Sequence, residues 1–564
     1  MRFRGVGAIV NIIAKSPVKG QSGRINGQLF PVDFYNGNFS SNYTYVVDKV
    51  RMSVYGSGNF FNTNKPEVFN SKDVVTAGKL IHTDKQSGKL HGHSDGGQVS
   101  ALVDYEISSK SFASLDASYQ LSSSKGYSPY SGSVYSDGQK MYNFQDSTER
   151  YYHNDKYTAS AYYQTKFTPN SSMNTQVRYE TGIPENSVLY KEITDQGGTS
   201  NMHQEDKEHW QTLETQINFM QEIKKVKIEE GYRLYWMGNE MNNNVNGMAD
   251  QSNHVQWRNY FYANLIGSIK EKFVYQAGTG FDISKVLLNG AINDRQNVLV
   301  PQVTFRYNIN NKQNVRLNYN VYREMATYSW YLNPTPRYNI DTSKVSFGNP
   351  NLTPYYRHAF KSSYSIGDNK LYFNVSAGGM VSTNPIMTLE YLGEDGIYYT
   401  TWVNTYRKSN YTYSMSVNYK FFDKLTVNIF GAINYHILED NRYSQLNMHY
   451  RAYDCGANVS LQLPKFFGYV SYFPQFRNPT QTGYVRNPET CNIYFSYTPS
   501  NHLVFNFGVE NLFPQVTTQE TYLHDYTEFY RRNNRNEHLA FFMGFYYRFA
   551  YGKQMEKNRN VKSY

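Results

Sequence analysis

The sequence predicts an all-β chain that folds as a 22-stranded antiparallel transmembrane β-barrel. Three observations lead to this fold class: a composition typical of strands, apolar residues at every second position, and connections that alternate between short and long. Together they favour strands that each present one apolar face and one mostly polar face.

The composition excludes several other classes of protein. The chain has 564 residues, of which 17% are aromatic, including 55 tyrosines, and 18% are charged. A disordered chain lacks aromatic residues. A helical membrane protein has apolar runs of ~18 or more residues, and none stands in this sequence. Many tyrosines, asparagines and serines therefore favour strands.

Charge and cysteine content exclude further classes. The net charge is +10, but the lysines and arginines are scattered, so no basic block indicates nucleic-acid binding. The two cysteines, Cys455 and Cys491, cannot build a disulfide scaffold or a metal framework. They fall on the predicted strands 18 and 20, about 10 Å apart, which is too far for a disulfide. Both are interpreted as small lipid-facing residues.

Alternation of apolar and polar residues recurs from one end of the chain to the other. Near the C-terminus, six large side chains share one face of a predicted strand: Leu539, Phe541, Met543, Phe545, Tyr547 and Phe549. Similar alternation predicts strands near 21–34, 38–47, 49–63, 94–108, 111–123, 151–166, 170–183, 207–222, 225–240, 252–268, 272–287, 297–309, 313–327, 354–366, 369–383, 397–421, 424–437, 447–461, 466–477, 485–498, 502–513 and 537–549.

The connections decide the architecture. Every even-numbered strand except the last ends in a short polar turn, such as Asp48-Lys49 or Lys224-Lys225. Most of the intervening connections are expected to be long and irregular, including roughly 64–93, 124–150, 184–206, 241–251, 328–353 and 514–536. An outer-membrane barrel has this asymmetry and an even strand number. A soluble barrel with this many strands would leave an unfilled lumen, and a propeller would show a constant repeat.

Three stretches carry a family resemblance. "GVGAIVNIIAK" includes Gly7, Asn11, Ile12 and Lys15, and "FGNPNLTPYYRH" includes Gly348, Asn349, Pro350, Leu352 and Pro354. The third is "ENLFPQ" followed by "MGFYYRFAYGKQ". They resemble the TonB-dependent outer-membrane receptors, in particular the outer membrane protein beta-barrel family common in Bacteroidetes. In that family the first stretch closes a plug domain just before the barrel.

The resemblance implies domains, partners and a location. Residues 1–18 are expected to be a remnant of the last plug strand, 19–550 the barrel, and 551–564 a periplasmic tail. The expected location is the outer membrane, with lipid and lipopolysaccharide as surroundings. The TonB complex would act through the plug, which is missing from this sequence, and a surface lipoprotein is a further candidate partner. The chain is thus expected to be N-terminally truncated, as an expression fragment, a partial gene, or a gene with a misplaced start codon.

The opening run has a second interpretation. Its basic start and the apolar residues 5–14 also fit a secretory signal peptide. Asparagine interrupts the run, however, and no A-x-A cleavage site follows, so the plug remnant is preferred.

The resemblance implies energised uptake of a bulky solute such as a glycan, a peptide or a metal chelate. A passive pore or a scaffold barrel without a plug is the alternative. No G-x-S-x-G, H-E-x-x-H or Walker-type motif is present, so neither an enzyme nor a cofactor is expected. The second rival is an outer-membrane enzyme, such as a protease or an acyl hydrolase, although such barrels are typically smaller and carry clustered acidic/His or Ser/His groups.

Candidate ligand-binding residues lie in the long connections. Two aromatic-rich connections could stack on sugar or aryl faces, although aromatic residues also form the interface girdles of barrels. A neighbouring arginine could pair with an anionic ligand or with lipopolysaccharide phosphates. The histidines of the connection near 82–93 are a weak metal candidate, against a simple polar loop. The residues are Tyr328, Trp330, Tyr331 and Tyr338; Tyr522, Tyr526, Tyr530 and Arg531; and His82, His91 and His93.

Overall fold

The computed structural model describes residues 19–30, 36–65, 69–76, 79–88, 90–270, 272–324, 329–334, 336–338, 344–393, 397–480, 483–513, 515–523, 526–534 and 539–551. The predicted plug remnant at 1–18, including its four motif positions, and the tail beyond Tyr551 lie outside these residues. Among the described residues, no helix is both long enough and apolar enough to cross a bilayer.

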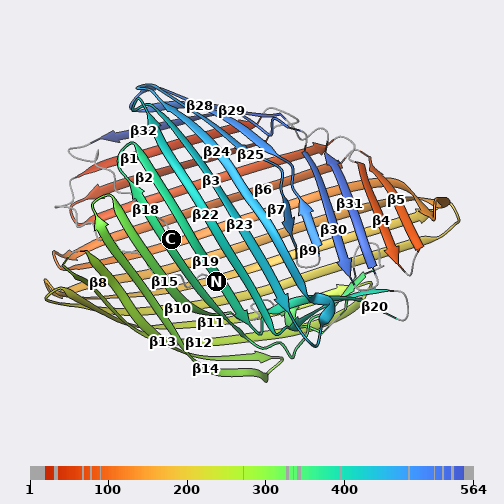
Figure 1. Ribbon diagram of the computed structural model, residues 1–564, viewed down its shortest axis with the longest axis horizontal. Coiled ribbons are helices and arrows are strands. Elements are labelled where there is room, and N and C mark those ends of the chain that lie inside the picture. Colours follow the sequence, from red (N-terminus) through yellow and green to blue (C-terminus); the bar gives the residue numbers. More distant parts are fainter. Residues whose placement is uncertain are drawn as a thin grey trace.

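A closed antiparallel barrel of 22 strands forms the body of the protein, which confirms the predicted strand number (Figure 1). The ring closes because β1 pairs with β2 on one side and with β32 on the other. The barrel strands are β1 (Gly20–Phe30), β2 (Asn36–Val47), β3 (Val50–Lys65), β6 (Leu90–Ser108), β7 (Ser111–Ser136), β8 (Gln139–Thr168), β9 (Ser171–Thr194), β10 (Thr199–Ile223), β11 (Val226–Val245), β12 (Met248–Ile269), β13 (Phe273–Leu288), β14 (Ala291–Asn310), β15 (Gln313–Glu324), β18 (Tyr355–Gly367), β19 (Leu371–Thr383), β22 (Arg407–Phe421), β23 (Leu425–Glu439), β24 (Met448–Gln462), β25 (Phe466–Phe473), β28 (Thr490–Ser500), β29 (Leu503–Glu510) and β32 (Ala540–Tyr551).

The barrel carries its apolar side chains on the outside. Leu115 on β7, Leu299 on β14 and Ile429 on β23 are 61%, 61% and 55% exposed, and alternate residues point into the lumen. On β32 the predicted apolar face is outermost, with Met543 48% exposed and its neighbour Phe542 9% exposed. A barrel whose outer surface is apolar needs a non-aqueous environment to cover it.

Most of the connections predicted to be irregular contain regular strands. The prediction is wrong for 124–150, 184–206 and 241–251, since β7 to β12 continue through them as long hairpins. It is also wrong for 64–93 and 514–536, most of whose described residues form four further short strands. β8 alone has 30 residues, whereas a membrane strand needs ~9–11. These hairpins therefore form a wall that projects well beyond any bilayer.

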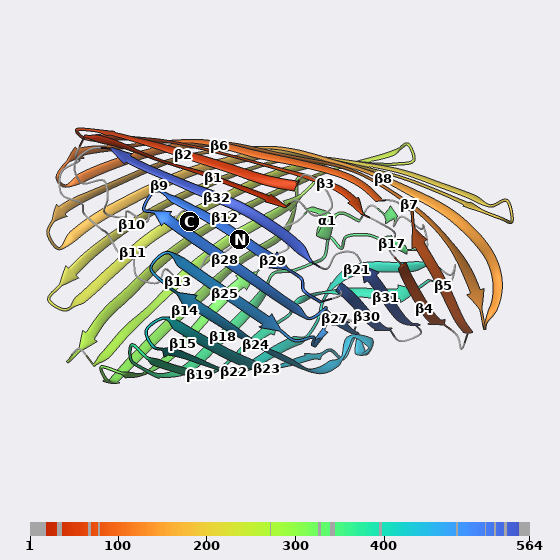
Figure 2. The ribbon, with the colours of Figure 1, turned by 90° about the horizontal axis from the view of Figure 1, so that it is seen from above.

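Six short strands extend this wall as a side sheet. They are β4 (Phe69–Thr76), β5 (Lys79–Ser87), β26 (Arg477–Pro479), β27 (Gly483–Arg486), β30 (Gln515–Leu523) and β31 (Tyr526–Asn534). Starting from β7, the pairing order is β5, β4, β31, β30, β27 and β26. Figure 2 shows most of these strands gathered at the end of the barrel opposite the short turns.

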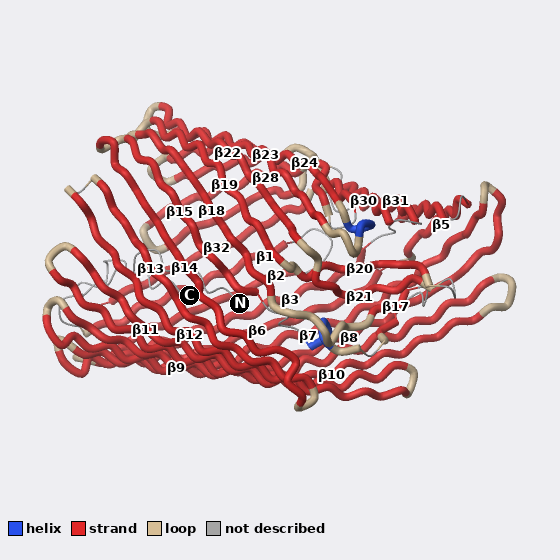
Figure 3. The backbone as a smooth tube through the Cα atoms, turned by 60° about the horizontal axis from the view of Figure 1, so that its bottom comes forward, coloured by secondary structure: helices blue, strands red, loops and turns tan. Residues whose placement is uncertain are grey.

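A second small sheet, here called the cap, lies at the same end of the barrel. It contains β16 (Arg337–Tyr338), β17 (Lys344–Ser346), β20 (Ile386–Leu392) and β21 (Tyr398–Asn404), with the short helix α1 (Ser329–Leu332) beside it. The single strand predicted at 397–421 is thus wrong, because the chain breaks into β21 and β22 at Thr405 and Tyr406. A one-turn 3-10 helix, η1 (Ser444–Leu446), precedes β24, and Figure 3 shows the described chain as almost entirely strand.

Candidate functional site

The lumen wall carries a row of polar side chains that runs across seven strands. Residues opposed in register on neighbouring strands project from the same face of a sheet. The inward-facing row, here called the lumen row, follows this register from β7 to β13: Asp116, Ser160, Arg178, Glu214, Tyr235, Arg258 and Ser284. Acidic, basic and hydroxyl groups alternate along it, so the wall can bind a polar solute at many points.

Ion pairs fix the charges beside the lumen row. Glu180 on β9 accepts a hydrogen bond from Arg178 Nη2 at 2.7 Å and lies 3.1 Å from Lys156 Nζ. The Arg178 side chain is 40% exposed, so this part of the wall is open to solvent in the lumen. The open, charged surface is accessible to a solute that enters the barrel.

Further along the row the wall is covered by the segment that holds α1. Asn333 Nδ2 donates to Asp250 Oδ2 at 3.1 Å, and Leu332 is only 1% exposed. Beneath this cover, Asp282 is fully buried and accepts a hydrogen bond from Arg258 Nε at 2.7 Å. The cap region therefore closes one side of the lumen at the end of the long hairpins.

The stretch "GNPNLTP" connects the segment that holds α1 to strand β21 of the cap. Gly348 N and Asn349 N donate to the carbonyl oxygens of Asn333 and Tyr331 at 2.6 and 2.7 Å. Asn349 Nδ2 donates to the carbonyl oxygen of Trp402 at 2.8 Å, which joins this stretch to β21. These contacts give the motif a structural role in the cap.

Other residues of the same stretch make further contacts with the cap and with α1. Thr353 N donates to Asn404 Oδ1 at 2.8 Å, and Asn404 Nδ2 returns a hydrogen bond to the Thr353 carbonyl oxygen at 2.9 Å. Leu352 is 3% exposed in an apolar cluster with Val286 and Leu332. The remaining motif positions, Pro350 and Pro354, lie in the same connection before β18.

The described aromatic candidates fall in two separate regions, the cap with α1 and the side sheet. Tyr331, at the end of α1, packs edge-on against Trp402 with ring centroids 5.1 Å apart, and Tyr530 on β31 donates to Asn70 Oδ1 at 3.0 Å. These two rings are held by neighbours within the chain. The backbones of Trp330, Tyr338, Tyr522 and Tyr526 lie in α1, β16, β30 and β31, and Tyr328 is outside the described residues.

The histidines of the metal hypothesis are also separated. His82 on β5 is opposite Tyr135 of β7, whereas His93 on β6 is opposite Lys125 of the same strand. His91 lies on β6 opposite Tyr127, and His93 Nε2 contacts Asp95 Oδ2 at 2.5 Å. No group of three or more His, Cys, Asp or Glu residues in the described part of the chain is arranged to hold a metal ion.

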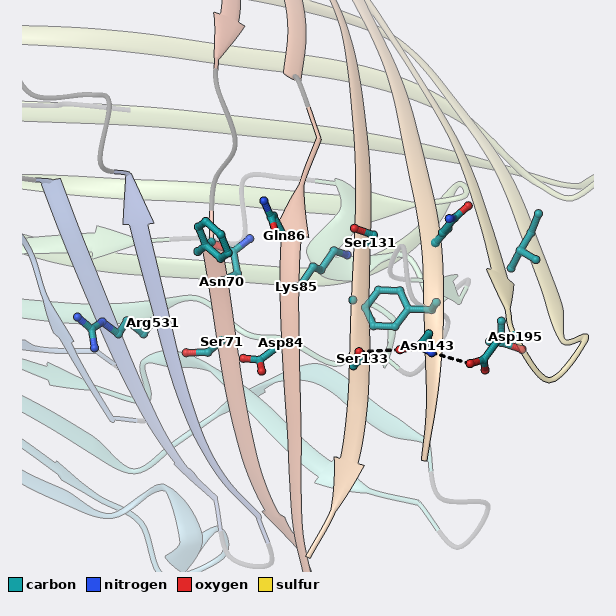
Figure 4. Close-up of a pocket in the computed structure, with 16 residues that line it drawn as sticks. Asn70, Ser71, Asp84, Lys85, Gln86, Ser131, Ser133, Asn143, Asp195 and Arg531 are labelled. Carbon is teal, nitrogen blue, oxygen red and sulfur yellow. Dashed lines mark hydrogen bonds between the residues drawn. The ribbon is translucent and has the colours of Figure 1, made fainter. Parts of the chain in front are cut away.

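A pocket of about 910 Å³ lies at the junction of the side sheet and the wall (Figure 4). Its lining includes Arg531, Ser71, Asp84, Ser133, Asn143 and Asp195, which lie across five strands and the β9–β10 turn. Ser133 Oγ donates to Asn143 Oδ1 at 2.8 Å, and Asn143 Nδ2 donates to Asp195 Oδ2 at 2.7 Å. Ser133 has the same parity on β7 as the outward-facing Leu115, so this polar set is not part of the lumen wall.

His82 lies beside this pocket between two carboxylates. Its Nδ1 contacts Asp73 Oδ1, and its Nε2 is 3.0 Å from Asp84 Oδ1. The hydrogen bond to Asp73 raises the pKa of His82 above 6.5, against the opposing effect of partial burial. The side chain is 34% exposed, so solvent weakens the interaction.

We expect His82 to make the side sheet less stable as the pH rises. A raised pKa in the folded state gives stability that is complete below pH 6.5 and is lost as the pH passes the folded pKa. The loss of folding free energy is expected to be ~0–1 kcal/mol because His82 and Asp73 are both partly exposed. Titration of the His82 ring by NMR, with His82→Asn to assign the signal, measures it; a pKa at or below 6.5 would contradict the expectation.

Comparison with known proteins identifies the family. Residues 168–547 match the model of the outer membrane protein beta-barrel family. The chain belongs to this family. As a member of the outer membrane protein beta-barrel family it resides in the outer membrane, where its apolar outer surface meets lipid and its short turns face the periplasm.

Solved structures from Pseudomonas aeruginosa share the fold of this family member. The siderophore receptor PirA has a TM-score of 0.55 at 11% identity, over 96% of this chain and 82% of that chain. The ferric enterobactin receptor PfeA gives 0.61 at 11% identity, over 94% and 81%. FpvA bound to heterologous pyoverdines gives 0.62 at 9% identity, over 95% and 72%. No curated protein sequence matches the chain significantly.

The lumen row was not among the residues proposed from the sequence. Each of its members stands at an alternate polar position of a predicted strand, but nothing in the sequence states which residues are opposed across strands. The available signal was the charge itself, because Asp116, Arg178 and Glu214 are charged residues within segments that cross a membrane.

Proposed function

We propose that this outer-membrane barrel is a receptor that takes up a bulky polar solute through its lumen, with energy supplied by the TonB complex. The lumen row supports the proposal, since it lines the barrel with alternating charged and hydroxyl groups that can bind a solute in steps. The cap supports it as well, because a covered lumen suits regulated entry better than free diffusion.

The fold neighbours point in the same direction. PirA is described as a siderophore receptor, PfeA as the ferric enterobactin receptor, and FpvA as a protein bound to pyoverdines. At this low sequence identity the comparison supports a shared fold but not a shared ligand. We therefore propose only that the solute is polar and too large for a narrow pore.

Two matched substitutions on one strand test the proposal. Glu180 faces the lumen and is ion-paired, whereas Glu185, five residues away on β9, faces outward and lies 3.6 Å from Lys207. We expect Glu180→Gln to lower uptake roughly tenfold, the equivalent of ~1.4 kcal/mol, because Arg178 and Lys156 lose their shared carboxylate. Glu185→Gln is the control and is expected to leave uptake unchanged.

The measurement is accumulation of fluorescent polar solutes, namely oligosaccharides, peptides and ferric chelates, in cells that express the protein. Cells with and without an active TonB system are compared. Uptake of one solute class that needs TonB and depends on Glu180 supports the proposal. Uptake that persists without TonB would instead identify a passive pore.

A further inference from the structure

The pocket at the junction of the side sheet and the wall is lined mainly by two rows of side chains on the outward face of the sheet (Figure 4). Ser133 has the outward parity of Leu115, and residues opposed in register share a face, so both rows point away from the lumen. The first row consists of Arg531, Ser71, Asp84, Ser133 and Asn143, with Asp195 of the β9–β10 turn at its end. The second row, two residues away along the strands, consists of Phe69, Gln86, Ser131, Gln145 and Ile193.

This site, here called the outer pocket, lies outside both the membrane and the lumen. Ser133 stands about 22 residues along β7 from Ser111, whereas ~9–11 residues of strand cross a bilayer. The outer pocket is therefore in water beyond the lipid. The sheet of the wall separates it from the lumen row, so a molecule bound there does not lie on the path through the barrel.

The polar groups of the outer pocket match the hydroxyl groups of a sugar. A sugar hydroxyl both donates and accepts hydrogen bonds, and the pocket offers donors and acceptors together. An amide, carboxylate or guanidinium group is planar and presents two polar atoms or more, so it can bind two adjacent hydroxyls of one ring. The hydroxyl groups are those of Ser71, Ser131 and Ser133, the amides Gln86, Asn143 and Gln145, the carboxylates Asp84 and Asp195, and the guanidinium Arg531.

Part of this polar set is already held in position. Ser133 Oγ donates to Asn143 Oδ1 at 2.8 Å, and Asn143 Nδ2 donates to Asp195 Oδ2 at 2.7 Å. A hydroxyl oxygen has two lone pairs and an amide nitrogen two hydrogens, so these groups can still bind a ligand. Asp84 lies 3.0 Å from His82 Nε2, and its side chain is 60% exposed. Groups that are held in place lose less conformational entropy when a ligand binds.

Apolar side chains stand at both ends of the second row. Phe69 is 53% exposed and Ile193 is 44% exposed. Both lie beyond the lipid, where exposed apolar groups mark contact sites. A sugar ring has an apolar C–H face and a polar edge, so the ring of Phe69 can pack on the face while the first row binds the edge.

The charges of the outer pocket favour a neutral ligand. Four of its lining residues are charged, two of each sign. Lys85 is ion-paired with Asp146, and Asp84 with His82, which leaves Arg531 and Asp195 near opposite ends of the first row. A phosphate site would gather several cations at one point, and a calcium site several carboxylates.

We propose that the outer pocket binds a neutral oligosaccharide on the outside of the barrel wall. Its volume of about 910 Å³ is near the upper end of the ~300–1,000 Å³ range of ligand pockets, so it suits several sugar units better than one. Such a ligand has two possible sources. One is the sugar chain of lipopolysaccharide in the surrounding membrane, and the other is a free oligosaccharide from the medium.

The first test measures binding to the full chain in detergent micelles by isothermal titration calorimetry. One probe is a set of short neutral oligosaccharides, and the other is the polysaccharide released by mild acid from lipopolysaccharide of the organism that carries the gene. We expect Asn143→Ala to weaken binding at least about tenfold, because it removes the middle group of the hydrogen-bonded chain. Asn201→Ala on β10 is the matched control, since Asn201 is exposed and outward-facing but does not line the pocket.

A second variant blocks the outer pocket without removing that chain of hydrogen bonds. Ser71→Trp places an indole in the centre of the site and is expected to abolish binding, whereas Asn201→Trp adds the same bulk elsewhere and leaves binding unchanged. Circular dichroism and electrophoretic mobility before and after heating show that each variant is a folded barrel. Loss of binding in a folded Ser71→Trp chain therefore reports on the pocket itself.

Each outcome bears on the proposal. Binding of the released polysaccharide alone supports it and identifies lipopolysaccharide as the source, and binding of the short oligosaccharides alone supports it with a source in the medium. A wild-type chain that binds neither probe overturns it. Binding that is weakened by Glu180→Gln in the lumen, but not by Asn143→Ala or Ser71→Trp, also overturns it. The uptake proposed for the lumen is tested separately and can fail without affecting this result.

Discussion

Replacing Asp282 with alanine is expected to destabilise the barrel by ~3–5 kcal/mol, the cost typical of breaking a buried ion pair. Asp282 has no exposed surface and accepts a hydrogen bond from Arg258 Nε at 2.7 Å, while Arg323 Nη1 lies 3.9 Å away. The alanine leaves two guanidinium groups under the cap without their shared carboxylate. A buried charge that loses its counter-charge is far more costly than the loss of the pair as a whole.

Urea unfolding of the refolded protein in lipid vesicles measures this free energy. Asp454→Ala on β24 is the control, because Asp454 has the inward parity of its strand and is exposed. A difference between the two variants of less than about 1 kcal/mol would show that Asp282 is solvated or neutral, contrary to the geometry.

Gly348→Ala is expected to detach the cap while the barrel stays folded. A Cβ atom at Gly348 would lie 2.4 Å from the carbonyl oxygen and 2.5 Å from the nitrogen of Asn333. Both are backbone atoms, so the two segments must separate, at a cost of ~1–3 kcal/mol for overpacking. The hydrogen bonds of Gly348 and Asn349 to this segment are lost with the separation.

Hydrogen exchange of the cap amides, compared with those of the barrel, reports the detachment. We expect faster exchange at Gly348, Asn349 and Leu352 and no change in β22 or β23. Gly431→Ala is the matched control, since its nearest contact would be an ordinary 3.6 Å from Cys455 Cβ. Equal protection of the cap in both variants would contradict the role assigned to the motif.

The strands and short turns could be predicted from the sequence because lipid imposes a strict alternation on the outer face. The long hairpins could not be predicted by alternation, since no lipid acts on β7 to β12 beyond the bilayer. A local signal was nevertheless present. Asp137-Gly138, Asn246-Gly247 and Asn289-Gly290 have positive φ at both residues, and such dipeptides favour two-residue hairpin turns.

The candidate sites were predictable only in part. Arg531 and His82 stood out as charged or titratable residues in connections, and the side sheet places both near one pocket. Their neighbours Ser71 and Ser133 come from strands far apart in the sequence, and only register brings them together. The lumen row and the lining of this pocket are set by pairing between strands, which a single sequence does not display.

The pairing of β1 with β32 also bears on how the protein assembles. Gln21 is opposite Tyr551, so the contact that closes the ring joins residues more than 500 positions apart. Contacts of such long range form slowly. Until they form, β1 and β32 each present an edge of unpaired amides and carbonyls, which lipid does not tolerate. Ring closure and insertion are therefore expected to occur together, and an assembly factor that shields these two edges would accelerate biogenesis more than one acting on any hairpin.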